Sequence, residues 1–95
     1  MQAPVRERPI RIFKQEELID FVQKEFGETA VVGPFIGICS CLLITEKSSF
    51  IINSRLFIRE ITSTGYLENN NAKEIENALK EAYFNQTRGV DQNVQ

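Results

Sequence analysis

The chain has 95 residues, of which 42% are hydrophobic and 25% are charged, and its formal net charge is −2. This length predicts a single domain with one modest core, and this composition is typical of globular rather than disordered proteins. The small negative charge creates no overall attraction to nucleic acid or to anionic membranes. Charge therefore argues against nucleic acid as the partner.

Two segments bear on where the protein resides. The first residues, MQAPVRERPIRIF, contain no apolar stretch followed by a small-residue cleavage site, so we expect no secretory signal and a cytoplasmic location. Thr29–Thr45 contains no charged residue, but it is shorter than the ~20 residues that cross a bilayer, and Gly33-Pro34 interrupts it. We therefore expect no membrane segment.

The first half of the chain predicts a strand, a helix and a second strand. Pro9–Phe13 alternates apolar and basic residues, which is typical of a short strand. KQEELIDFVQKEFG predicts a helix, because its apolar residues recur at helical spacing and Gly27 follows its end. Phe35–Ile44 is apolar at both alternating sets of positions, which predicts a strand in the middle of a sheet.

The second half predicts two short strands and another helix. SSFIINSRLFIREIT is rich in Ile and Phe and favours two strands hinged at Asn53-Ser54, and residues 62–71 then form a loop or an irregular edge. Asn71 and Glu74 have the spacing of a helix capping box, and an apolar stripe follows over about Ala72–Asn85. The residues after Gln86 show no periodicity.

Together these elements predict an α+β fold. We expect a small two-layer sandwich, in which an antiparallel sheet of three to four strands carries both helices on one face, in the order β-α-β-β-(β)-α. The domain spans residues 9–86, between a flexible N-terminal arm at residues 1–8 and a mobile tail at residues 87–95. Many unrelated small domains share this order, so it does not select a function.

The cysteines predict structure rather than chemistry. Cys39 and Cys41 are the only cysteines, and the chain has no histidine. A zinc site needs about four ligands, and a redox pair needs Cys-x-x-Cys at the start of a helix. We therefore expect no metal site and no cofactor. Free Cys is among the most buried residue types, so both thiols are expected to line the core.

No catalytic arrangement is apparent either. A nucleophilic Ser or Cys normally recruits a histidine, which this chain lacks. Carboxylates that work as an acid and a base need burial to separate their pKa values. The acidic residues of the two helices are expected on solvated faces instead, namely Glu16, Glu17, Glu74, Glu76 and Glu81. We therefore expect no enzyme.

The stretch RLFIR is the candidate partner-binding site. On a strand, Arg55, Phe57 and Arg59 would line one face, and Leu56 and Ile58 would line the other. Arginine beside an exposed aromatic is typical of protein-interface hot spots, and also of platforms that stack single-stranded nucleic acid. It is equally typical of a half-buried strand with two solvated arginines.

A second basic group lies near the N-terminus and consists of Arg6, Arg8 and Arg11. These residues suit a flexible arm that contacts phosphates or acidic partners, although a soluble terminus is the more ordinary role.

We therefore expect a small cytoplasmic protein-binding module, such as an inhibitor, an adaptor or a chaperone-like subunit. The alternatives are a nucleic-acid-binding domain that uses the RLFIR arginines and the basic arm, and an enzyme with carboxylate chemistry. Because two helices cover one sheet face, we also expect a homodimer that buries the other face. The N-terminal arm, residues 62–71 or a different protein are alternative covers. The uncovered set is either Ile36, Ile38, Leu42 and Ile44 or Phe35, Cys39, Cys41 and Leu43.

Overall fold

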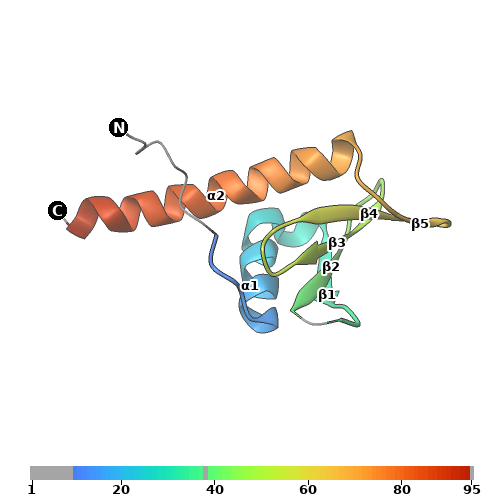
Figure 1. Ribbon diagram of the computed structural model, residues 1–95, viewed down its shortest axis with the longest axis horizontal. Coiled ribbons are helices and arrows are strands. Elements are labelled where there is room, and N and C mark those ends of the chain that lie inside the picture. The colour runs from blue at the N-terminus through green and yellow to red at the C-terminus, as the bar shows by residue number, and fades with distance from the viewer. Residues whose placement is uncertain (1–9, 38, 95) are drawn as a thin grey trace, which may run out of the picture.

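A computed structural model describes the backbone at residues 10–37 and 39–94 and the side chains at 10–37 and 39–87. It has one sheet of five antiparallel strands in sequential order, with a helix before it and a helix after it (Figure 1). The α+β class is confirmed. The predicted strand number and element order are wrong, because the observed order is α-β-β-β-β-β-α. The elements are α1 (Gln15–Phe26), η1 (Gly27–Thr29), β1 (Val31–Pro34), β2 (Ser40–Ile44), β3 (Ser49–Asn53), β4 (Ile58–Thr62), β5 (Gly65–Leu67) and α2 (Asn70–Val94).

The strand predicted at Pro9–Phe13 is wrong over the part that the structure describes, which is irregular up to the start of α1. It is joined to the domain by the Phe13 side chain and by one backbone hydrogen bond, from the Phe13 N–H to the Ser54 carbonyl at 3.1 Å, rather than by a strand ladder. The Phe13 ring is buried, stacks on Phe21 at 5.4 Å and meets the edge of Tyr83 at 5.9 Å between centroids. The alternation therefore reflects one buried side chain between exposed neighbours.

The charge-free run around Phe35–Ile44 forms a hairpin, so the single strand predicted there is wrong. β1 and β2 pair antiparallel, with Val31 opposite Ile44. The loop between them contains Gly37 at φ 150° and Cys39 at φ 54°, and neither value is compatible with a continuous strand. Pro34 lies at the end of an edge strand, which is where sheets tolerate a residue without an N–H.

One face of the sheet packs against both helices. Side chains alternate along each strand, so Cys41 and Leu43 of β2 and Phe50 and Ile52 of β3 all point into this core. The helices fill it with their apolar stripes, which include Leu18, Phe21 and Val22 of α1 and Ala72 and Leu79 of α2. Of the two sets predicted for the uncovered face, the Cys41 and Leu43 set is therefore the covered one.

The hinge predicted at Asn53-Ser54 is confirmed as the turn between β3 and β4. The Asn53 side chain holds this turn, because its Oδ1 accepts hydrogen bonds from the backbone N–H groups of Arg55 (2.8 Å) and Phe57 (3.1 Å). Leu56 takes a left-handed φ of 65° and is fully buried. Burying Leu56 in this conformation leaves Phe57 on the outer side of the turn, where it is half exposed.

The second helix begins earlier and ends later than predicted. Asn69, not Asn71, caps it, because the Asn69 Oδ1 accepts from the backbone N–H of Ala72 at 2.9 Å. The helix continues to Val94 instead of ending near Asn85. Its 25 residues span about 37 Å, so it projects beyond the sheet in Figure 1. The mobility expected for residues 87–95 stays a prediction.

Leu43→Ala tests this core. Leu43 is fully buried, whereas Leu67 on β5 is 49% exposed. We expect Leu43→Ala to lower the free energy of unfolding by about 2 to 5 kcal/mol through lost burial and a residual cavity. The matched change Leu67→Ala should cost less than about 1 kcal/mol. Urea denaturation of both variants measures this difference, and equal losses would contradict the burial of Leu43 in the core.

Candidate functional site

The second face of the sheet is not covered by either helix. We call it the open face. Its side chains alternate with the core residues along the strands, and the strand register arranges them in rows across the sheet. Several of them are large and apolar, and Val31 and Tyr66 are 66% and 54% exposed. The open face comprises Val31, Gly33, Leu42, Ile44, Ser49, Ile51, Arg59, Ile61 and Tyr66.

A hollow of about 590 Å³ lies at one end of the open face. Ser40 and Asn53 are opposite each other on β2 and β3 and lie at its base together with Ile51. The loop between β1 and β2 forms one side, and residues around β4 and β5 form the other. The residues that line it are Phe35, Ile36, Gly37, Ser40, Ile51, Asn53, Phe57, Arg59, Tyr66 and Glu68.

Gln15 fixes the loop side of the hollow. Its side-chain Nε2 donates to the backbone carbonyl of Ser40 at 2.6 Å and to that of Phe35 at 3.3 Å. The first residue of α1 therefore connects the two ends of the β1–β2 loop, because Phe35 follows β1 and Ser40 begins β2. Ile36, at 94% exposure, protrudes from the loop beyond this tie.

Phe57 is held on the opposite side by α2. The Lys80 ammonium lies 4.7 Å from the centroid of the Phe57 ring, which is cation–π geometry. Lys80 is itself fixed by the Glu76 carboxylate, 2.9 Å away. The other Glu76 oxygen accepts a hydrogen bond from the backbone N–H of Ile58 at 3.2 Å. One turn of α2 thus positions the aromatic side chain at the entrance to β4.

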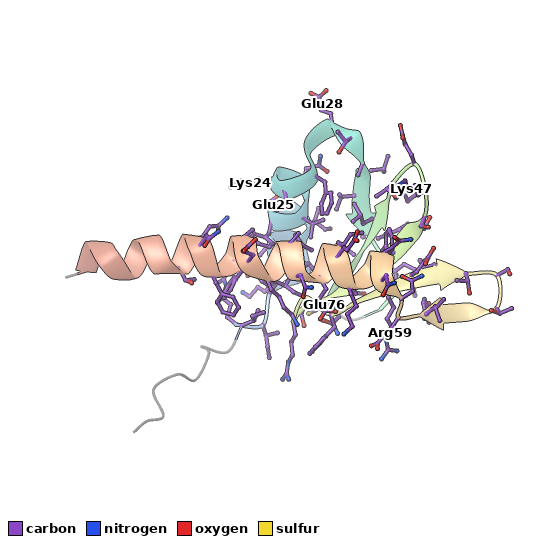
Figure 2. The ribbon with its side chains drawn as sticks, turned by 90° about the horizontal axis from the view of Figure 1, so that it is seen from above. Lys24, Glu25, Glu28, Lys47, Arg59 and Glu76 are labelled. Carbon is purple, nitrogen blue, oxygen red and sulfur yellow. The ribbon has the colours of Figure 1, made fainter. Side chains whose placement is uncertain are left out.

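The environment of Glu76 differs from the one that the sequence predicts. The sequence placed it on a solvated helix face, but its side chain is buried beside β4, and Figure 2 shows it at α2 with Arg59 further toward the β4–β5 hairpin. β5 pairs with β4 only from Glu60 onward, so the N–H of Ile58 needs another acceptor. Glu76 supplies that acceptor and Lys80 balances its charge, which makes its role structural.

Phe57 and Arg59 both line the hollow, as the RLFIR prediction requires, but Arg55 does not. Arg55 lies exposed in the β3–β4 turn, and Phe57 precedes β4, so the three residues do not share one strand. The Arg59 Nε lies 3.7 Å from a Glu68 carboxylate oxygen. Arginine and glutamate thus form an exposed pair at the edge of the hollow.

The predicted basic arm is described only at Arg11, because Arg6 and Arg8 lie outside the described residues. Arg11 is engaged within the chain. Its guanidinium lies 3.5 Å from the Glu17 carboxylate and 5.0 Å from the centroid of the Phe13 ring. The side chain therefore covers the aromatic anchor of the first segment.

The two cysteines have different environments. Cys41 is fully buried among the core residues, and this burial raises the pKa of its thiol to about 12. Cys39 is partly exposed in the β1–β2 loop, so its predicted place on a buried strand is wrong. Both are free thiols. Among the described residues, no group of three or more His, Cys, Asp or Glu side chains is arranged to hold a metal ion.

Eight of the ten residues that line the hollow lie outside the predicted partner-binding site, namely Phe35, Ile36, Gly37, Ser40, Ile51, Asn53, Tyr66 and Glu68. Tyr66 and Glu68 were missed because residues 62–71 were expected to form a loop, whereas β5 pairs with β4 there. The available signal was Thr62-Ser63-Thr64-Gly65, a tight turn that the Thr62 hydroxyl closes by donating to the Gly65 carbonyl at 2.8 Å.

Comparison of the chain with protein-family models, with curated proteins and with solved structures gave no match. Among the helices of the described residues, none is long and apolar enough to cross a membrane.

Glu60 connects the start of α2 to the sheet. Its carboxylate accepts hydrogen bonds from the Ser48 hydroxyl (2.5 Å) and from the Asn69 side-chain amide. The bond from Ser48 and then the bond from Asn69 lower the pKa of Glu60 below its usual 4.5. Because Asn69 also caps α2, this carboxylate helps to place the helix that positions Phe57.

Glu60→Gln tests this connection. Because the folded protein lowers the Glu60 pKa, the stabilisation is fully present above pH 4.5 and is lost as the pH falls through the lower folded value. We expect the unfolding free energy of Glu60→Gln to fall less steeply with acidification below pH 4.5 than that of the wild type. Urea titrations at a series of pH values measure this slope. Glu46→Gln, in an exposed turn, is the control, and equal slopes for all three proteins would contradict the assignment.

Proposed function

We propose that this chain is a small protein-binding module that acts by covering a partner's surface, as an inhibitor, an adaptor or a chaperone-like subunit. The observation that carries the proposal is the open face, where large apolar side chains and a hollow lie outside the single core. Fully burying such a side chain is worth about 1.5 to 3 kcal/mol. A partner that covers this face therefore gains the free energy of burying apolar side chains that neither helix buries.

The chemistry of the hollow suits a protein partner. Tyr and Arg are enriched among the residues that contribute most binding energy, and Phe and Tyr rings are enriched in interface cores. Phe57, Arg59 and Tyr66 all line the hollow, and Lys80 holds the Phe57 ring in place before binding. Residues positioned in advance lose less conformational entropy when a partner docks.

A protein partner is favoured over nucleic acid by the charges around the hollow. Arg59 is paired with Glu68, Arg55 lies outside the hollow, and the chain as a whole carries −2. Tight binding of a phosphate backbone draws on several cationic side chains acting together. The hollow contributes one arginine, and a carboxylate lies beside it.

Surface binding is also favoured over catalysis. Cys41 points into the core, and burial keeps its thiol protonated. Glu76 is buried, and its carboxylate already forms an ion pair with Lys80 and accepts a hydrogen bond from the backbone N–H of Ile58. The hollow presents Ser40, Asn53, Arg59 and Glu68 as polar groups, and the chain has no histidine to activate the serine. Free thiols suit a reducing compartment, so we propose a cytoplasmic location.

Removing Phe57 and Arg59 tests the proposal. The immobilised wild-type chain and the double variant Phe57→Ala, Arg59→Ala are exposed to native lysate that contains untagged copies of the chain, and captured proteins are then purified and titrated directly. We expect the double variant to bind at least about tenfold more weakly, as is usual for interface hot spots. Circular dichroism checks that the variant folds.

Arg55→Ala is the matched control, because Arg55 is exposed close to the hollow without lining it. It should bind as the wild type does. Capture of no protein, or equal affinity of the double variant and the wild type, would overturn the proposed function.

A further inference from the structure

We propose that the open face is covered by the open face of a second copy of this chain, related by a twofold axis that runs parallel to β3 near Ile51. The inference rests on the proposed function and names its partner. Association through a sheet edge is less suited to this chain. β1 has four residues and includes Pro34, which has no N–H to donate, and β5 has three residues.

The strand register makes the apolar residues self-complementary under this axis. β1 of one copy lies over β5 of the other, and β2 lies over β4. Val31 and Tyr66 occupy the same row at opposite ends of the sheet, so Val31 meets Tyr66 of the second copy. In that row Ile44 meets Ile61 of the second copy in the same way. Two sheets that face each other pack about 10 Å apart, which is the reach of such side-chain pairs.

The charges of the open face also permit this pairing. Arg59 and Glu68 are adjacent and of opposite sign, so two copies meet without an unpaired charge of one sign. In the second row, Arg59 of the second copy lies over Leu42, and its ion-pair partner Glu68 lies toward Gly33 at the β1 end. A Cβ at Gly33 would meet no atom within 4 Å, so this end of the row is open space. It provides room for the Arg59–Glu68 pair of the second copy.

The hollow receives Ile36 of the other copy, the most exposed of the large hydrophobic side chains that the structure describes. Under the same axis, the β1–β2 loop of the second copy lies over the β4 and β5 side of the first. This loop carries Ile36, which is 94% exposed and protrudes beside Phe35. An isoleucine that enters the hollow contacts Phe57 and Tyr66, the residues to which the proposed function assigns partner binding.

The size of the face sets the expected affinity. Five strands about 4.8 Å apart and roughly five residues long give a footprint of about 20 by 16 Å. Stable dimers usually bury about 800 Å² on each partner, and this footprint of about 320 Å² falls below that size. We therefore expect a dimer that dissociates at micromolar rather than nanomolar concentration.

A charge-complementation experiment tests the pairing. Sedimentation equilibrium of the full chain, from micromolar to sub-millimolar concentration, should show a reversible dimer. Val31→Lys and Tyr66→Glu should each weaken dimerisation by at least about tenfold, because each buries a charge in the interface with no counter-charge opposite it. Mixing the two variants should restore a heterodimer, because the lysine of one then faces the glutamate of the other. Ile12→Lys, at an exposed isoleucine before α1, should leave the dimer unchanged.

Both residues are more than half exposed in the single chain, so both variants should fold, and circular dichroism verifies this. Should Tyr66→Glu fail to fold, Ile44→Lys mixed with Ile61→Glu gives the equivalent test. A wild type that stays monomeric, or a dimer that Val31→Lys does not weaken, would overturn the second copy as partner. The proposed function would still stand if Phe57→Ala, Arg59→Ala abolished capture of a different protein.

Discussion

The structure depends on one constraint, which is that two helices with one apolar stripe each can seal only one face of a five-stranded sheet. Phe13, Leu18, Val22 and Leu79 form this seal together with the core side chains of the sheet. Because side chains alternate along a strand, burying Leu43 and its neighbours in the core places the intervening apolar residues outside it. The open face therefore follows from the same packing that makes the domain stable.

Polar contacts at α2 connect that packing to the hollow. Asn69 caps the helix and also donates to Glu60 on β4, which anchors the helix start to the sheet. About two turns later, Glu76 accepts a hydrogen bond from the N–H of Ile58, and Lys80 follows at the next turn over the Phe57 ring. The side chain most central to the proposed binding site is thus held by contacts that also stabilise the fold.

The residue pattern predicted those features that depend on residues close together in the sequence. The helical stripe of α1, the turn at Asn53-Ser54 and the buried environment of Cys41 were all predictable from the sequence. The hairpin at residues 31–44 was not, because neither alternating set of residues there is polar, and Cys39, which takes a positive φ, is not a residue type that favours turns. Glu76 could not be placed either, since its burial depends on a free N–H of a strand far away in the sequence.

The central claim is that the working state of the protein covers the open face, and an NMR interaction map tests it most directly. Spectra of the isotope-labelled chain are recorded at rising concentration and then in native lysate. The account predicts that the backbone signals of Val31, Ile51 and Tyr66 shift or broaden, while those of Lys24 and Glu25, exposed on α1, stay unchanged. Changes confined to α1 and α2, with the open-face signals constant under both conditions, would contradict it.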